Sequence, residues 1–187
     1  MSNNASPTRP GAARSPQPVP LILTLALDEA AQARFEALRR AHFPPARNRV
    51  PAHATLFHRL PGEQAEAVEA TLAALCRDAA PCPVEVEGLR FLGGGVAFVL
   101  RSPPLAALRD RLRAAWLPWL TPQDRQPWRP HVTVQNKAAP EAARRLHGEL
   151  SRGFAPFVAT ATGLRLWRYL SGPWEAARGF PFGADPC

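Results

Sequence analysis

Two short stretches of this chain carry a histidine and a threonine at the same spacing. The first has the sequence PAHATL over residues 51–56, and the second has RPHVTV over residues 129–134. Residues two apart in an extended strand point to the same face of a sheet. Each stretch therefore presents one imidazole and one hydroxyl together, His53 with Thr55 and His131 with Thr133. The apolar residues between and after them point the other way, into a core.

Two imidazoles and two hydroxyls have the chemistry needed to cleave a phosphodiester. Imidazole titrates near neutral pH, so one histidine can act as a base while the other acts as an acid. Threonine hydroxyls can donate to the non-bridging oxygens and stabilise the charge that builds on phosphorus. No carboxylate-rich cluster accompanies the histidines, so we expect neither a metal nor a cofactor. A single His-x-Thr is common in ordinary strands, and the prediction depends on the matched pair.

Residues near the second motif are candidates for substrate contact. Arg129 could bind phosphate and Trp128 could stack on a base, although a packed Trp and a solvated Arg would have the same sequence. Tyr169 could also stack on a base, with packing at the rim as its alternative. His58 is expected at a strand end, with a place in the cleft as the alternative.

Periodicity and turn residues predict the elements that position these side chains. A continuous apolar run and alternating segments indicate strands, and apolar residues at helical spacing indicate helices. Strands are expected at 21–27, 52–58, 84–92, 96–100, 130–135, 154–170 and 174–182. Helices are expected at 28–42, 63–78, from 103 onward with Trp119 on its inner face, and at 141–150. Asp28 and Ser102 are the expected capping residues, and the glycines at 93–95 are expected in a hairpin turn.

The order of these elements is duplicated. Strand, helix, loop, strand with His-x-Thr, helix and strand occur once from Leu21 and again from Val96. If the copies pair about a pseudo-twofold axis, both His-Thr faces converge on one cleft. We therefore predict an α+β fold with two pseudo-symmetric lobes, antiparallel sheets lining a central cleft, and helices outside.

With its paired motifs, the chain resembles the 2H phosphoesterase superfamily, and within it the bacterial RNA 2′,3′-cyclic phosphodiesterases, also called 2′-5′ RNA ligases. The segment WRPHVTV at 128–134 is the most specific stretch. The resemblance implies a metal-independent enzyme that opens a 2′,3′-cyclic phosphate of RNA ends or nucleotides to a 2′-phosphate, with 2′-5′ ligation as the reverse reaction. It also implies His131 as the base and His53 as the acid, and the motif symmetry allows the opposite assignment.

Two alternatives to this function stay open. One keeps the histidine pair but acts on RNA 3′ ends or linear 2′-5′ linkages. The other is a non-catalytic RNA-binding module on the same fold. The chain also departs from the resembled family after the first motif, where FHRLPG at 57–62 replaces a Phe-Leu-Gly-like turn. This difference affects the expectation of which substrate is used more than the expectation of which reaction is catalysed.

Composition sets the broader expectations. The formal net charge is +8 and Lys137 is the only lysine. Arginine-rich chains suit anionic partners, and a GC-rich genome produces the same bias. Residues 1–18 lack large apolar side chains and are expected to form a disordered tail before a single domain at 19–187. No apolar run reaches the roughly 20 residues of a membrane span, and three cysteines without zinc spacing indicate a reduced, cytoplasmic protein. We expect a monomer.

Overall fold

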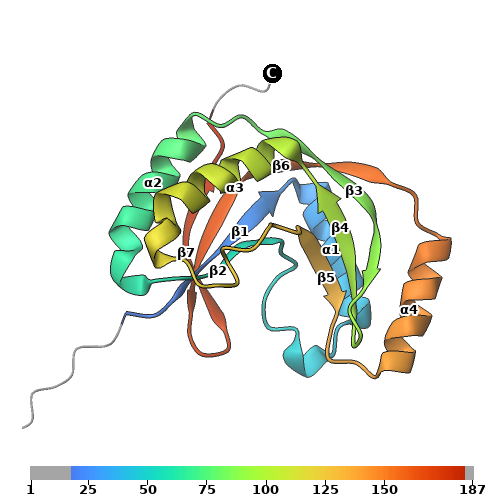
Figure 1. Cartoon of the computed structure of the whole chain (residues 1–187). Helices are drawn as coiled ribbons and strands as arrows, with labels where there is room; N and C mark the ends of the chain where they lie inside the picture. The colour runs from blue at the N-terminus through green and yellow to red at the C-terminus, as the bar shows by residue number, and fades with distance from the viewer. Residues whose placement is uncertain (1–17, 184–187) are drawn as a thin grey trace, which may run out of the picture.

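A computed structural model describes residues 18–183, which form four α-helices and one seven-stranded sheet (Figure 1). The strands are β1 (Leu21–Leu27), β2 (Thr55–Leu60), β3 (Cys82–Phe91), β4 (Val96–Arg101), β5 (His131–Gln135), β6 (Phe157–Tyr169) and β7 (Trp174–Pro181). The helices are α1 (Glu29–His42), α2 (Ala65–Arg77), α3 (Pro103–Trp116) and α4 (Pro140–Arg152), with 3-10 turns at Pro45–Arg47, Gly62–Gln64 and Leu117–Trp119. The predicted tail, except residue 18, and the last four residues of the predicted domain lie outside the described range.

The strand order shows the duplication directly. The sheet runs β2-β1-β6-β3-β4-β5, and every pairing is antiparallel. Exchanging β1 with β4, β2 with β5 and β3 with β6 reproduces the same order in reverse. The pair β3–β6 lies at the centre and joins the two halves. Strand β7 pairs only with the second part of β6 and has no counterpart in the other half of the described chain.

One helix from each copy packs against the strands of the other copy. Figure 1 shows α1 and α4 on the side of β3, β4 and β5, and α2 and α3 on the side of β1, β2 and β7. Phe35 of α1 packs edge-on against Phe98 of β4, with ring centroids 5.5 Å apart. Trp116 of α3 packs in the same manner on Phe57 of β2 at 5.2 Å. Helix α1 of the first copy thus packs on β4 and β5 of the second copy, and α3 of the second copy packs on β2 of the first.

The two predicted capping residues behave differently. Asp28 accepts a hydrogen bond from the Ala31 amide at 2.9 Å, which caps α1, and its other oxygen accepts from the Thr160 amide of β6 at 2.6 Å. Ser102 lies at the start of α3 but makes no side-chain capping bond. Its hydroxyl donates instead to the carbonyl of Pro83 at 2.7 Å. The expected capping bond of Ser102 is therefore wrong, because a neighbouring strand offers the hydroxyl an acceptor.

The predicted fold class and order of elements are confirmed, and the differences lie at element ends. Strand β2 begins at Thr55 rather than at residue 52, so His53 precedes the paired residues. Trp119 lies partly buried on a 3-10 turn after α3, not on the helix itself. No helix within residues 18–183 is long and apolar enough to cross a bilayer.

Candidate active site

The two motifs lie on strands with the expected apolar undersides. Ala54, Leu56, Val132 and Val134 are all at most 1% exposed. The Leu25 amide of β1 donates to the carbonyl of Ala54 at 2.9 Å, which extends the contact of the two strands to the segment just after His53. Packing below each motif therefore holds the backbone from which the polar side chains project.

The same backbone contact orients both imidazoles. His53 Nδ1 lies 2.6 Å from the carbonyl oxygen of Pro51, and His131 Nδ1 lies 2.9 Å from that of Arg129. A carbonyl only accepts, so Nδ1 is the donor in each ring. The neutral tautomer then carries its lone pair on Nε2, the nitrogen available to a substrate.

Two buried arginines tie each motif to the other copy. Arg39 of α1 donates to the carbonyl of Thr133 at 2.8 Å and to that of Val50 at 3.2 Å. Arg109 of α3 donates to the carbonyl of Leu56 at 3.2 Å. Its Nη2 also donates to carbonyls of the loop before the second motif, at residues 124 and 126. Each arginine therefore joins one motif strand to the loop that leads into the other motif.

Burial favours the neutral form of both histidines. It lowers the pKa of His53 to about 4, and the positive charges of Arg39, His131 and His58 act in the same direction. Burial also lowers the pKa of His131, assisted by the charges of Arg90 and His58. The influence of His131 on His53, and of His58 on both rings, places these imidazoles in one electrostatic site. A bound anion would raise both pKa values, because it favours the charged form of imidazole.

A cleft of about 430 Å³ opens beside the motifs. Its lining is rich in Arg, His and Gln and consists of Thr55, Leu56, His58, Arg90, Arg109, Gln123, Gln126, Pro127, Trp128, Arg129 and His131. Four of the predicted site residues are therefore in its wall, namely Thr55, Trp128, Arg129 and His131. His53 and Thr133 are not in the wall, although both belong to the motifs.

His53 is covered by an aromatic side chain from β7. The Trp174 ring lies 4.7 Å from the imidazole, between centroids, and 6.1 Å from the ring of Trp167. The Trp167 indole donates to the hydroxyl of Thr24 at 2.8 Å, which holds this aromatic pair on the sheet. Tyr169, the residue predicted to stack, is exposed at the end of β6, pairs with Trp174 across the ladder, and does not line the cleft.

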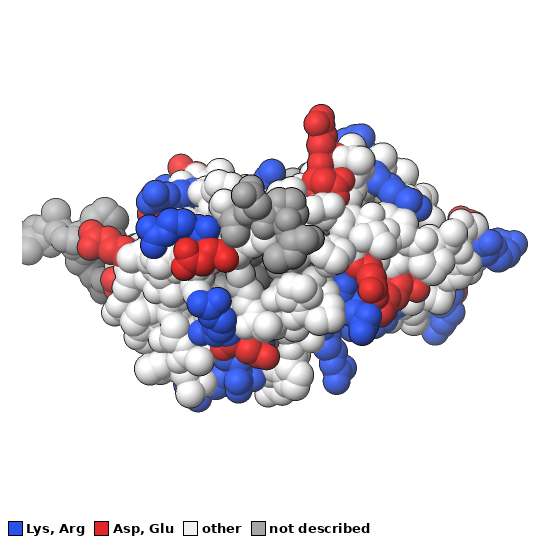
Figure 2. Space-filling model, turned by 90° about the horizontal axis from the view of Figure 1, so that it is seen from above, with Lys and Arg blue, Asp and Glu red and all other residues white. Residues whose placement is uncertain are grey.

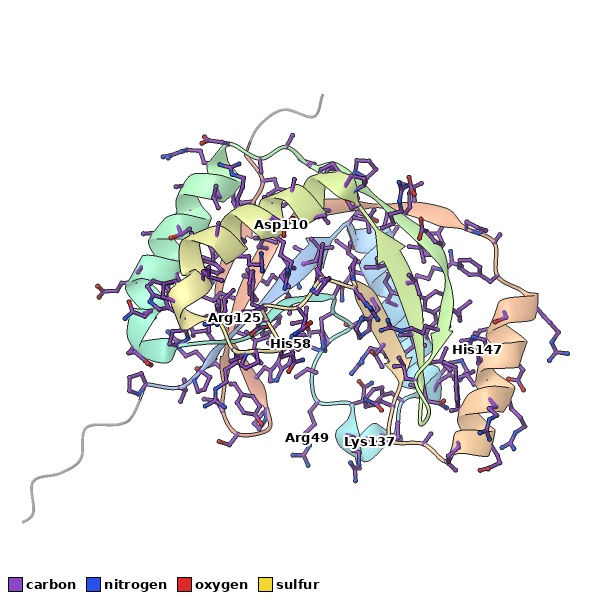
Figure 3. The ribbon with its side chains drawn as sticks, in the orientation of Figure 1. Arg49, His58, Asp110, Arg125, Lys137 and His147 are labelled. Carbon is purple, nitrogen blue, oxygen red and sulfur yellow. The ribbon has the colours of Figure 1, made fainter. Side chains whose placement is uncertain are left out.

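His58 lines the cleft, as the alternative placement allowed. Two register shifts along the β1–β2 pairing interrupt the simple alternation of β2, so Leu56 and Phe57 are both buried while His58 is exposed. A bulge of this kind re-aims side chains. Figure 3 shows His58 near the middle of the molecule, between the two halves.

Asp124 fixes the His58 ring. Its carboxylate, which is fully buried, accepts from His58 Nδ1 at 3.1 Å and from the amides of His58 and Arg59 at 2.8 and 3.0 Å. Thr121 adds a hydroxyl donor at 3.2 Å. Burial alone would raise the pKa of Asp124, but the donors, with His58 foremost, lower it below its usual value. His58 therefore offers Nε2 to the cleft.

The strand register places further side chains in line with the threonines. Thr133 is opposite Ala97, which is opposite Arg90. In the other half Thr55 is opposite Thr24, which is opposite Arg165. Directly paired residues project from the same face, so each motif threonine has an arginine two strands away.

Sequence analysis missed several residues at the site. Arg90 and Trp174 belong to segments far from either motif, Asp124 lies in the loop before the second motif, and no local pattern distinguishes the three. The place of Arg90 at the site could have been inferred only from the strand register, which requires knowing that β3 pairs with β4. Trp128 was predicted, but its indole donates to the carbonyl of Thr55 at 2.9 Å, so it also fastens the loop to β2.

Comparison with known proteins agrees with this architecture. A family model described as the 2′-5′ RNA ligase superfamily matches residues 27–173. The chain is similar to TT0787 of Thermus thermophilus, with a TM-score of 0.63 and 19% identity over 89% of this chain and all of that one. It is also similar to E. coli LigT complexed with 3′-AMP, with a TM-score of 0.59 and 17% identity over 90% of this chain and all of LigT. No curated protein sequence matches.

The match spans both His-x-Thr motifs, the helices α1 to α4 and the strands β2 to β6. The structural similarity covers 89% of the chain for TT0787 and 90% for LigT. The chain therefore belongs to the 2′-5′ RNA ligase superfamily, the 2H phosphoesterases.

Proposed function

We propose that this protein opens the 2′,3′-cyclic phosphate of RNA ends or nucleotides to a 2′-phosphomonoester, with 2′-5′ ligation as the reverse reaction. The observation that carries the proposal is the matched orientation of the two imidazoles. Each ring is tied through Nδ1 to the carbonyl two residues earlier, so each directs Nε2 toward a substrate. The complex of the related LigT with 3′-AMP supports a nucleotide ligand.

The reaction replaces one phosphorus–oxygen bond by another and needs two proton transfers. His131 takes a proton from water, whose oxygen attacks phosphorus while the bond to the 3′ oxygen breaks. His53 gives its proton to that departing oxygen. The hydroxyls of Thr55 and Thr133 donate to the non-bridging oxygens. The negative phosphate favours the charged form of imidazole, so His53 takes up from the solvent the proton that it lacks in the free protein.

The surroundings of the two rings support this division. His131 lies in the wall of the cleft, where water and substrate can meet. His53 is not among the lining residues and contacts the ring of Trp174, which shields it on one side. The opposite assignment is tested with a 4-nitrophenyl phosphodiester, since nitrophenolate leaves without a proton. His53→Ala should then retain activity that His131→Ala loses.

The decisive assay offers a 2′,3′-cyclic mononucleotide and cyclic-ended RNA in the presence of excess chelator. We expect a 2′-phosphomonoester as the product and a bell-shaped dependence of kcat/KM on pH. Undiminished turnover by the His53→Ala, His131→Ala double variant would overturn the proposal. Salt-dependent RNA binding without turnover would indicate a binding module. Cleavage of linear RNA without ring opening would indicate the other phosphodiesterase.

A further inference from the structure

The cleft carries more positive charge than one phosphodiester requires. Three arginines and two histidines line it, and no Asp or Glu is among its lining residues within the described part of the chain. By contrast, acidic and basic side chains are interspersed over the face shown in Figure 2. One cyclic phosphate carries a single negative charge, so the excess positive charge suits a second anion.

The arginines of the cleft are not equivalent. Arg109 is committed to carbonyl oxygens, including that of Leu56, and its role is to hold the loop. Arg90 has a different environment, because its Nε is buried and has no hydrogen-bond partner within residues 18–183. A buried donor without a partner is unfavourable. Arg90 also lines the cleft, so its guanidinium can turn toward an anion bound there.

Arg90 lies next to the reacting site. It shares a row of the sheet with Thr133, separated only by the small side chain of Ala97. Its charge also acts on His131, whose pKa it helps to lower. An anion bound by Arg90 would therefore lie beside a phosphate held at His131 and Thr133.

His58 completes the arrangement from the opposite half of the molecule. Asp124 accepts from His58 Nδ1, so the ring is held and Nε2 faces the cleft. The imidazolium form of a ring held in this way can donate through Nε2 to an anion, with the Asp124 carboxylate beside Nδ1. A buried carboxylate held by four donors is a built support for a ring that the two-histidine reaction does not use.

We propose that Arg90 and His58 form a second phosphate subsite beside the His-Thr pair, which binds a phosphate attached to the nucleoside that bears the cyclic phosphate. This rests on the proposed function. The preferred substrates are then cyclic-ended nucleotides with another phosphate, either a 5′-phosphomonoester or the phosphodiester of an upstream nucleotide. A bare nucleoside 2′,3′-cyclic phosphate leaves the subsite empty.

The test compares kcat/KM for three substrates: adenosine 2′,3′-cyclic phosphate, its 5′-phosphorylated form, and a dinucleotide with the same cyclic end. A charged hydrogen bond contributes about 1.5–3 kcal/mol, so the second phosphate should raise kcat/KM about tenfold or more. The 5′-phosphate and the dinucleotide arms show which source of phosphate the subsite accepts.

Arg90→Gln and His58→Gln should each bring the ratio of kcat/KM with the second phosphate to kcat/KM without it closer to one. The preference is a ratio measured on a single protein sample, so a partly misfolded variant does not alter it. Arg145→Gln and His147→Gln are the matched controls and should keep the preference. Arg145 is exposed on the outer helix α4, and Figure 3 shows His147 on that helix, away from His58.

Two failures are distinguishable. If the wild-type protein opens all three substrates equally well, or if Arg90→Gln keeps the full preference, the subsite is refuted and the ring-opening function stands. If none of the three substrates is opened, the proposed function itself is wrong.

Discussion

The two motifs are built alike and sit in unlike surroundings. In each, a buried apolar underside supports the strand, a carbonyl two residues earlier holds Nδ1, and a buried arginine from the opposite half binds the strand carbonyls. His53 of the first motif, however, contacts Trp174 of β7, whereas His131 of the second lines the cleft together with Arg90.

This difference would allow a duplicated structure to divide the two proposed roles. Identical environments would give two imidazoles of equal pKa, with no reason for one to donate and the other to accept. Strand β7 has no counterpart in the other half of the described chain, and it supplies the side chain that covers His53. The asymmetry therefore comes from a strand added to the duplicated framework, not from the motifs.

Removing either imidazole should have the largest effect. His53→Ala and His131→Ala are each expected to lower kcat about 10³-fold, because an acid or a base is lost from the transition state. Steady-state kinetics with a cyclic mononucleotide checks this. If one variant keeps near wild-type kcat, the two motifs do not share one reaction.

The threonines test whether both motifs bind the reacting phosphate. Thr55→Val and Thr133→Val should each reduce kcat about 10²-fold, since each removes one donor to the charge that builds on phosphorus. Valine keeps the shape and the strand preference, and circular dichroism controls for folding. An unchanged rate in Thr133→Val alone would mean that only the first motif contributes a hydroxyl.

Asp124→Ala should weaken the contact between β2 and the loop that precedes the second motif. The change leaves the donors of His58, Arg59 and Thr121 without their acceptor, which should cost about 3 kcal/mol in the free energy of unfolding. Urea denaturation at neutral pH measures it. Asp110→Ala, on the exposed surface of α3, is the control and should change stability little.

The pH dependence of this stabilisation has a defined sign. The pKa of Asp124 is lowered in the folded protein, so its contribution is complete above the unfolded value of about 3.9. It is lost as the pH falls through the folded pKa, which lies lower. The stability difference between the wild type and Asp124→Ala should therefore shrink only under strongly acidic conditions.

Trp174→Ala addresses the asymmetry itself with the smallest expected effect on structure. Removing the ring hydrates His53, so its pKa should rise from about 4 toward 6.5, while that of His131 changes less. Titration of the histidine Cε1 protons by NMR measures both. If the pKa values of the two rings rise equally, Trp174 shields both imidazoles and not His53 alone.

The same variant changes the pH dependence of stability. His53 is harder to protonate in the folded state than in the unfolded state, so the wild-type protein loses stability as the pH falls from about 6.5 to about 4. In Trp174→Ala this loss should be smaller, because the two states then bind protons more nearly alike. Thermal unfolding at several pH values checks the slope.

Most of the architecture could be predicted because it depends on local patterns. The apolar run at β1, the alternation in β3 and the helical spacing of α3 identified their elements, and the repeated order identified the duplication. Element ends were less predictable. β2 begins two residues after His53, and Ser102 bonds to Pro83, because neighbouring strands decide where pairing starts and which acceptor a hydroxyl meets.

The sequence by itself determined the chemistry at the motifs. Residue type and period-two spacing put each imidazole beside a hydroxyl and above an apolar face, and these depend only on neighbours along the chain. The tertiary structure decided what surrounds them: Trp174 over His53, Arg90 in line with Thr133, and Asp124 behind His58. Those contacts join segments far apart in sequence, so the burial and charge that set each pKa arise only when the sheet and its bulge have formed.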